Sequence, residues 1–406
     1  MQESFSSIEM GMRIKRDSAL MKAHALIDWE RLRPLLSGLY KREASRAGGQ
    51  EPFDALLMFK ATLLGQWHSL SDPKLEAALT IRIDFMHFCG LTMLAAVPDE
   101  STLCRFRNRL IDAGKLAPLL AAVNAQLQGH GLMVAHAKGA VIDATLITAA
   151  ARPHSKTIIE HETNNDNDND GDGDGNSSSD TDAPTANQAE QAEHADHAAT
   201  AATNAIDTNS TTADATEPVA PVAVAPIVTK TASVDPDATW VKKGAKSHFG
   251  FRTYTTVDAG DGYIRGVHTA PANEGECPHF KAAIASADFK PERAYADKGF
   301  ASKANRQHLT DLGIKSAIMH KADRNKPLNQ RKKNLNKAIS KTRYIVEQCF
   351  GTMKRLFGMS RASYMGTVKV NAQFTIKAMC MNLLKAANKI CLLPIGAGDV
   401  RPERVG

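Results

Sequence analysis

A long acidic, low-complexity segment divides the chain, and it limits how the rest can fold. Between Ser155 and Val234 the sequence holds 15 Asp and Glu residues against 2 Lys and Arg, a net charge of −13. Such a segment cannot bury enough apolar area to offset the entropy that it would lose on ordering. We therefore predict a disordered insert over residues 154–235. A domain built from both sides of this insert must be discontinuous.

The charge outside this segment indicates a polyanionic partner. The whole chain of 406 residues carries a formal net charge of +6, so the residues outside the acidic segment carry +19. This excess favours nucleic acid as a partner over the alternative of a merely soluble basic protein. The length suffices for two or three domains.

The cysteines and the apolar tracts predict a cytoplasmic protein. The six cysteines form no C-x-x-C pair, and Cys277 with the nearby His279 is weak support for a zinc site. Reduced, mostly buried thiols are the simpler interpretation. The longest apolar tract, Ile376 to Leu393, is interrupted by three lysines, and the first residues contain no apolar signal region. We expect no membrane-spanning segment.

Residues 1–130 are predicted to form an all-helical domain. Apolar periodicity predicts a helix over Phe53–Trp67, and Ser71 followed by proline predicts the start of another, Lys74–Thr80. A third helix, Thr102–Ala113, is rich in arginine. Its candidate DNA contacts are Arg105, Arg107 and Arg109. The order of helix, break and Arg-rich helix suits a helix-turn-helix DNA reader, and equally a three-helix packing module.

Short apolar runs on both sides of the acidic segment predict a mixed α/β sheet. The run from Gly139 to Asp143 indicates a buried strand that ends on a carboxylate, as does Arg293–Asp297. Phe249–Asp258 and Tyr263–His268 flank a Gly-Asp-Gly turn and predict a hairpin. Ile314–Met319 is a further predicted strand, and helices are expected over 277–287 and from 300 to about 312.

The last third of the chain is strongly basic. Lys321–Arg343 contains nine Lys and Arg residues against one Asp, which predicts a loop that follows a phosphate backbone, or alternatively a solvated linker. Thr342–Lys354 is predicted to be a helix with two stripes. The polar stripe holds Arg343, Glu347 and Lys354, and for this helix alone a solvated salt-bridge stripe is the better explanation. The stretch Ala372–Leu392 is predicted to be an amphipathic helix that packs onto the body.

Three carboxylates can meet in this arrangement. Asp143 and Asp297 end predicted strands, and Glu347 lies on a helix that can cross those strand ends. Carboxylates this close repel one another unless cations lie between them, and oxygen-only ligands favour Mg²⁺ or Mn²⁺. Two such ions can activate a water or a 3′-OH in phosphoryl transfer.

The combination of motifs resembles a known family. D-A-T stands at Asp143, Y-A-D-K-G-F surrounds Asp297, and R-x3-E-x6-K joins Arg343, Glu347 and Lys354. Further similar stretches are L-S-D-P-K-L-E-A-A-L, P-D-E-S-T-L-C-R-F-R, W-V-K-K-G and F-G-F-R-T-Y-T-T-V-D. Together they resemble the DDE transposases of bacterial insertion sequences, in the insertion-sequence-five (and four) type. The related pattern has Tyr three residues before the Arg, where this chain has Ser340.

This resemblance implies an RNase H-like catalytic fold and metal-dependent cleavage at transposon ends, followed by attack of the freed 3′-OH on target DNA. It implies that Asp143, Asp297 and Glu347 form a catalytic triad that binds two Mg²⁺ or Mn²⁺ ions. The expected DNA contacts are Arg343, Lys354, Lys298, Trp240, Arg105, Arg107 and Arg109. The expected partners are terminal inverted repeats and target DNA, with a homodimer in the synaptic complex and a nucleoid-associated, cytoplasmic location.

The predicted organisation is an α/β protein in four parts. These are a helical N-terminal domain (1–130), a split RNase H-like catalytic domain (131–153 and 236–358), the disordered acidic insert (154–235) and a C-terminal helical extension (359–406). Two other functions remain open at this point. One is a structure-specific RNase H-like nuclease, and the other is a non-catalytic DNA-binding remnant or repressor.

Overall fold

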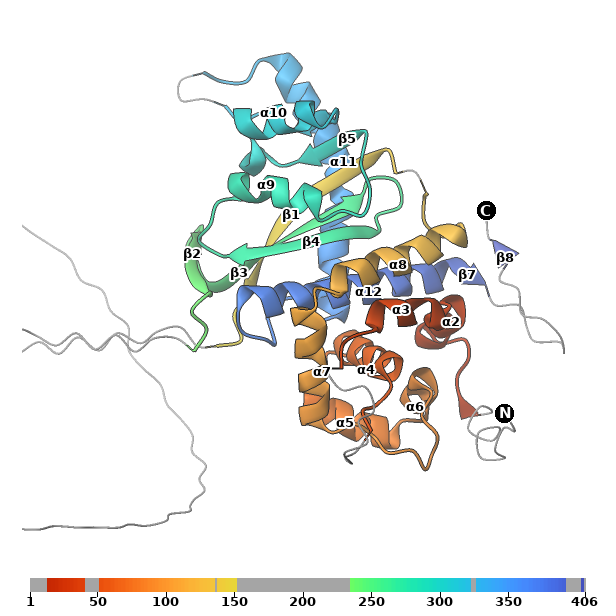
Figure 1. Cartoon of the computed structure of the whole chain (residues 1–406). Coiled ribbons are helices and arrows are strands. Elements are labelled where there is room, and N and C mark those ends of the chain that lie inside the picture. Colours follow the sequence, from red (N-terminus) through yellow and green to blue (C-terminus); the bar gives the residue numbers. More distant parts are fainter. Residues whose placement is uncertain are drawn as a thin grey trace, which may run out of the picture. The chain divides into compact units, whose positions relative to one another are not determined.

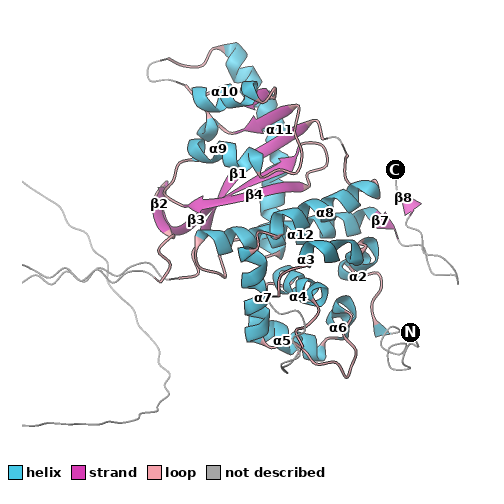
Figure 2. Cartoon of the chain, in the orientation of Figure 1, coloured by secondary structure: helices cyan, strands magenta, loops and turns pink. Residues whose placement is uncertain are grey.

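A computed structural model of the chain describes residues 13–40, 51–135, 137–151, 234–322, 326–391 and 403–404. The predicted acidic insert therefore lies almost wholly outside the described residues. Contacts group residues 1–154 with 232–406 into one compact unit, which holds every element described below (Figures 1 and 2). The predicted boundaries between a helical and a catalytic domain within this unit stay a prediction.

A six-stranded mixed sheet carries the candidate site. Its order is β2-β3-β1-β5-β6, with β4 also paired to β3. The strands are β1 (Gly139–Thr148), β2 (Thr239–Lys243), β3 (Lys246–Asp258), β4 (Ile264–Pro271), β5 (Arg293–Ala296) and β6 (Lys315–Ile318). Strands β1, β5 and β6 run parallel, whereas β3 is antiparallel to β1, β2 and β4. The mixed sheet and the β3–β4 hairpin are thus confirmed.

The first strand is longer than the sequence predicts. We expected it to end at Asp143, but β1 continues to Thr148, so Asp143 lies in the middle of the strand. The reason is long-range pairing: β3 supplies partners along β1 as far as the pair Thr148–Gly250. Gly250 also pairs with Thr239 of β2 on its other side. Its φ of 156° and the 2.0 Å that would separate a Cβ there from the Ile147 carbonyl oxygen require glycine.

Helices cover both faces of the sheet. Successive strand residues point to opposite faces. Ile142 of β1 packs with Phe280 of α9 (Glu276–Ala285) and Leu309 of α10 (Lys303–Asp311). The neighbouring residue Val141 belongs instead to the core shared with α11 (Gln330–Leu356) and α12 (Thr367–Lys389). Asp143 has the same parity as Val141, and it therefore faces α11.

The predicted basic loop over Lys321–Arg343 is wrong for most of its length. Helix α11 begins at Gln330, where the Asn329 side chain accepts a hydrogen bond from the Lys332 amide. The density of positive charge suggested a loop, but lysine, arginine, glutamine and leucine are good helix formers, and Asn329 provides the N-cap. Asn336 also bonds both backbone groups of His320, at 2.8 and 2.9 Å, which fixes the first turns against the end of β6.

The last long helix lies at the centre of the protein. It was predicted to be amphipathic, and this prediction is wrong. Every residue of α12 from Ala372 to Leu383 is buried. The helix packs against β4 and against three helices of the N-terminal part, α2 (Ala19–Leu26), α4 (Ala55–Trp67) and α8 (Leu116–Gly129). Because it is enclosed by these elements, little of its surface needs to be polar. The prediction that it packs onto the body is confirmed.

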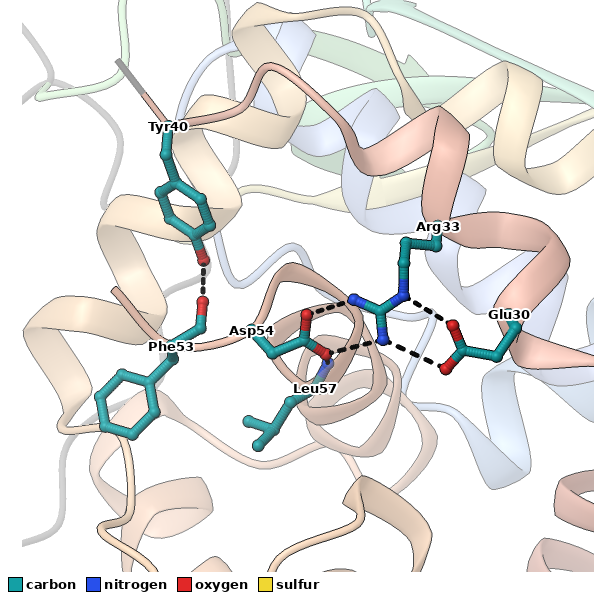
Figure 3. A network of polar contacts seen from close by, with 6 residues as sticks. All are labelled: Glu30, Arg33, Tyr40, Phe53, Asp54 and Leu57. Carbon is teal, nitrogen blue, oxygen red and sulfur yellow. Dashed lines mark hydrogen bonds and ion pairs between the residues drawn. The ribbon is translucent and has the colours of Figure 1, made fainter. Parts of the chain in front are cut away.

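The N-terminal part is helical, as predicted. Besides α2, α4 and α8 it contains η1 (Trp29–Leu32), α3 (Arg33–Leu36), α5 (Asp72–Ile81), α6 (Ile83–Cys89) and α7 (Glu100–Asp112). Figure 3 shows the contacts that join η1 and α3 to the start of α4. The Arg33 guanidinium bonds both Glu30 and Asp54, and Asp54 accepts a hydrogen bond from the Leu57 amide. No helix among the described residues is long and apolar enough to cross a membrane.

Candidate active site

Two aspartates stand level with each other on neighbouring parallel strands. Ile142 of β1 is in register with Ala296 of β5, so the next residues, Asp143 and Asp297, follow at the same height. Both side chains lie on the α11 side of the sheet, because each is one residue beyond a partner that faces α9. The structure thus brings together two carboxylates that are 154 positions apart in the sequence.

The Arg343 guanidinium joins these two carboxylates. Its Nη2 donates to Asp143 Oδ2 at 2.7 Å, and its Nη1 lies 3.5 Å from Asp297 Oδ1. The Arg343 side chain is only 10% exposed. The sequence predicted that Arg343 contacts DNA phosphates, but in this structure its partners are the two candidate catalytic residues.

Each aspartate is held in place by a backbone amide. Asp143 Oδ1 accepts from the Ala144 amide at 2.9 Å, and Asp297 Oδ1 accepts from the Lys298 amide at 2.6 Å. Burial raises the pKa of Asp143 above its ordinary value, while the Arg343 charge acts in the opposite direction. The charge of Asp297 adds to the upward shift. The Arg343 guanidinium thus favours the ionised form of Asp143 against the effect of burial.

Glu347 lies apart from this pair. It is one helical turn beyond Arg343 on α11, which places it on the same side of the helix, and its side chain is exposed. Among the described residues no three His, Cys, Asp or Glu side chains are close enough to hold a metal ion. The structure therefore brings Asp143, Asp297 and Arg343 together, and does not bring Glu347 into a ligand set with them.

A further carboxylate, which the sequence did not predict, lies beside the centre. Glu276, the first residue of α9, accepts from Arg252 of β3 at 3.2 Å. Burial raises the pKa of Glu276; Arg252 opposes this shift, and the charges of Asp143 and Asp297 reinforce it. A Cβ on Gly299 would lie 1.8 Å from Glu276 Oε2, so glycine makes room for this carboxylate. An acid in the first turn of a helix is too common a pattern to have indicated this position.

Cations lie beside the centre as well. A hollow of about 180 Å³ is lined by Ala144, Thr145, Leu146, Val241, Lys242, Lys243, Arg252 and Glu276. The predicted contact Lys354 is exposed on α11, and its pKa is lowered by partial burial and by the nearby charge of Lys243. Lys298 is exposed directly after Asp297. Trp240 is 50% exposed on the edge strand β2, where it packs against Phe249.

The three arginines of α7 differ in their surroundings. Arg105 and Arg109 are exposed and lie four residues apart, on one side of the helix. Arg107 is buried, bonds both oxygens of Asp72 at 2.6 and 2.9 Å, and stacks on Tyr364. Arg107 therefore holds α7 to α5, and an exposed cationic surface on this helix consists of the other two.

The weak zinc candidate has other partners. Cys277 lies 3.1 Å from the Gly299 carbonyl oxygen. The His279 ring bonds His268 at 3.0 Å and Glu274 at 2.5 Å. These contacts fasten the start of α9 to β4 and to the turn after Asp297. Cys277 and His279 thus help to hold α9 in place beside the site.

Comparison with known proteins gives concordant results. A transposase domain (DUF772) matches residues 9–109, and a transposase DDE domain matches residues 203–383. The chain is 35% identical over 286 residues to the transposase for insertion sequence element IS1106 of Neisseria meningitidis serogroup B; the alignment covers 70% of this chain and 78% of that protein. No solved structure is significantly similar. Asp297 and Glu347 fall inside the DDE match, and Asp143 precedes it.

Proposed function

Because the chain belongs to the DDE transposases of bacterial insertion sequences, we propose that Asp143, Asp297 and Glu347 form the centre that cuts and joins DNA. The observation that carries this proposal is the pair of aspartates, level on adjacent strands and directed at a single cation. Enzymes that cut phosphodiesters with two metal ions use converging carboxylates to hold those ions. The mixed sheet with helices on both faces supports an RNase H-like fold.

Asp143 and Asp297 fit a divalent metal ion. Their oxygens already converge on one positive group, the Arg343 guanidinium, and carboxylate oxygens are the ligands that Mg²⁺ and Mn²⁺ prefer. We infer that these residues hold two such ions. When bound, the ions supply activation of water or of a 3′-OH and stabilisation of the leaving oxygen. The backbone amides of Ala144 and Lys298 fix the orientation of the two carboxylates.

Glu347 completes the centre in this proposal. It shares with Arg343 the side of α11 that crosses β1 and β5, one turn further along the helix. A glutamate has a longer side chain than an aspartate, and its exposed carboxylate is free to turn towards the sheet. The proposal therefore requires a side-chain movement, while the buried neighbour Val346 keeps the helix itself in place.

DNA is proposed to lie along the exposed cations beside the aspartates. Lys298 directly follows Asp297, Lys354 and Trp240 are exposed on α11 and β2, and Arg105 with Arg109 form a second contact surface on α7. Whether α5 to α7 act as a helix-turn-helix stays a prediction. Synapsis of two transposon ends needs two active sites, which favours a homodimer. Terminal inverted repeats and target DNA as partners imply work in the cytoplasm, at the nucleoid.

The test is cleavage of DNA that carries the inverted repeats flanking the coding sequence. In Mn²⁺, Asp143→Asn, Asp297→Asn and Glu347→Gln should each slow end cleavage by roughly a thousandfold or more, because several kcal/mol of transition-state stabilisation are lost. Asp112→Asn, an exposed acid on α7, is the matched control. Full activity in any of the three variants would refute its assignment. Cleavage of branched DNA regardless of terminal repeats would indicate a structure-specific nuclease instead.

A further inference from the structure

The position of Arg343 gives it a role beyond a contact with DNA. Its side chain spans Asp143 and Asp297, with one guanidinium nitrogen assigned to each. A planar fork of this kind can bond two separate carboxylates at once, whereas a lysine ammonium is a single point of charge. Arg343 thus occupies the place between the two aspartates that the proposed function gives to metal ions.

When both aspartates are ionised they repel each other, and a cation between them relieves that repulsion. They come from adjacent strands and are mostly shielded from solvent, with side-chain exposures of 16% and 33%. Like charges at this separation repel, and partial burial weakens the screening by water. Without metal, Arg343 is the positive group that the structure provides for both of them. It therefore keeps the two side chains in a convergent arrangement before any metal arrives.

Arg343 is also only partly satisfied in this position. Its buried Nε has no hydrogen-bond partner among the described residues, and the sulfur of Met319, 3.8 Å from Nη1, is a weak acceptor. The surrounding helix is fixed by the buried side chains Ile339 and Val346. A departure of Arg343 therefore needs only rotation of its own side chain, and it exposes three nitrogens to new acceptors.

We propose that Arg343 is an exchangeable internal counter-ion. It holds Asp143 and Asp297 ready in the metal-free enzyme and yields them to a divalent cation; the released guanidinium then binds a DNA phosphate beside the centre. Metal binding and DNA binding are coupled through this exchange, and the coupling is reciprocal. This inference rests on the proposed metal site, and it makes Arg343 a positioning residue for the aspartates.

If Arg343 and the metal ion exchange places, removing Arg343 should raise the affinity of the protein for metal. Arg343→Gln removes the competing cation, while the Ala144 and Lys298 amides still orient the two carboxylates. The full-length protein without DNA should therefore bind Mn²⁺ about tenfold more tightly than wild type, within the usual range of coupling between sites. Electron paramagnetic resonance of free Mn²⁺ measures this directly and needs no catalysis. A purely structural role for Arg343 predicts the opposite, because splayed carboxylates bind metal less well. Equal or weaker binding by Arg343→Gln overturns the proposal.

Two further variants separate the possible failures. Arg343→Lys retains a charge but cannot bond both aspartates, so its Mn²⁺ affinity should lie between those of wild type and Arg343→Gln; this variant decides the matter if the glutamine variant does not fold. Asp143→Asn should bind Mn²⁺ at least tenfold more weakly. If Asp143→Asn binds like wild type, the metal site itself, and with it the proposed function, is refuted.

The second readout is DNA affinity. Ca²⁺ is also an oxygen-seeking cation and serves as the probe in place of Mn²⁺. It should strengthen binding of fluorescent terminal-repeat DNA to the wild-type protein about tenfold, and should have little effect on Arg343→Gln. The same enhancement in both proteins would show that Arg343 does not carry the coupling.

Discussion

Lys377 of α12 has a buried amine that lies at the C-terminal end of α11. Its side chain is 2% exposed, and Nζ donates to the carbonyl oxygens of Phe357 at 2.5 Å and Gly358 at 3.3 Å. These carbonyls close α11, and Gly358 has the left-handed φ of 59° that commonly follows a helix. Lys377 therefore ties α12 to the end of the helix that carries Arg343 and Glu347.

Replacing Lys377 by methionine should destabilise the protein by about 1–3 kcal/mol, because two buried carbonyl oxygens lose their donor. Urea unfolding at pH 7.5 measures the loss. Lys369→Met, on an exposed part of the same helix, is the control and should stay near wild type. Equal stability of Lys377→Met and wild type would show that water or another donor replaces the amine.

The same lysine gives a dependence on pH. Burial lowers the pKa of Lys377 from its ordinary 10.5 to about 8. Between these values the unfolded chain binds more protons than the folded one, so the contribution of Lys377 to stability rises with pH across that window. Lys377→Met should lack this rise. Unfolding of both proteins at pH 7.5 and pH 10 tests the sign.

At the scale of elements, α12 covers the start of the edge strand β4 through one side chain. Ile264 pairs with Val257 of β3, but its own amide and carbonyl face the helices, where Asn124 of α8 also donates to the carbonyl at 3.3 Å. Asn382 bonds both groups: its Oδ1 accepts from the Ile264 amide at 2.9 Å, and its Nδ2 donates to the Ile264 carbonyl at 2.8 Å and to Asn124 Oδ1 at 2.8 Å. A buried amide thus replaces a missing strand and excludes a foreign one.

Asn382→Leu keeps the branched shape of the side chain but removes these bonds, so it should cost roughly 2–4 kcal/mol, one penalty for each buried group left unpaired. Chemical unfolding measures the difference. Asn388→Leu, at an exposed position about one and two-thirds turns later on α12, provides the comparison and should change stability little. A small effect at Asn382 would mean that β4 relaxes to find other partners.

Local patterns predicted those elements whose signals are local. The apolar periodicity of α4, the start of α5 at Ser71 and the Gly-Asp-Gly turn of the β3–β4 hairpin are each contained within a few neighbouring residues. The full length of β1 depends on pairing with β3, which is about 100 residues away along the chain, and no local signal encodes it. The first turns of α11 were misjudged because their charge outweighed their helix propensity.

The candidate site shows the same division. Its aspartates could be predicted because each follows a short apolar run, and their pairing follows from adjacent strands. The burial of Arg343 and Arg107 could not be predicted, because a basic side chain on a polar stripe is usually exposed. Glu276 was missed because its approach to the centre depends on the turn that ends at Gly299.

At the scale of the whole molecule, the positive charge outside the acidic segment should be visible in DNA binding. If Arg105 and Arg109 each contact a phosphate, the double variant to Gln should reduce the slope of log K against log salt by about 2, roughly 0.9 per contact. Fluorescence anisotropy of terminal-repeat DNA between 50 and 200 mM salt, about the range where the effect is large, measures it.

Two exposed lysines on the opposite face of the sheet from α11 serve as the control. Changing both Lys281 of α9 and Lys303 of α10 to Gln removes two positive charges, as many as the Arg105 and Arg109 double variant removes. The slope of log K against log salt for this lysine double variant should match that of wild type if the phosphate contacts are specific to α7. The same decrease in both double variants would show that only net charge matters, and would exclude α7 as a particular DNA surface.

The shared partner Gly250 has a consequence for how this protein can change. It pairs with Thr148 on one side and Thr239 on the other, so the chain leaves the sheet and returns to it roughly 10 Å apart, two strand spacings. Closing a longer excursion between such near points costs only a logarithmic amount of entropy. The connection between Thr148 and Thr239 is therefore a suitable place for added sequence. A reporter domain could be inserted there while Asp143 and Asp297 keep their register.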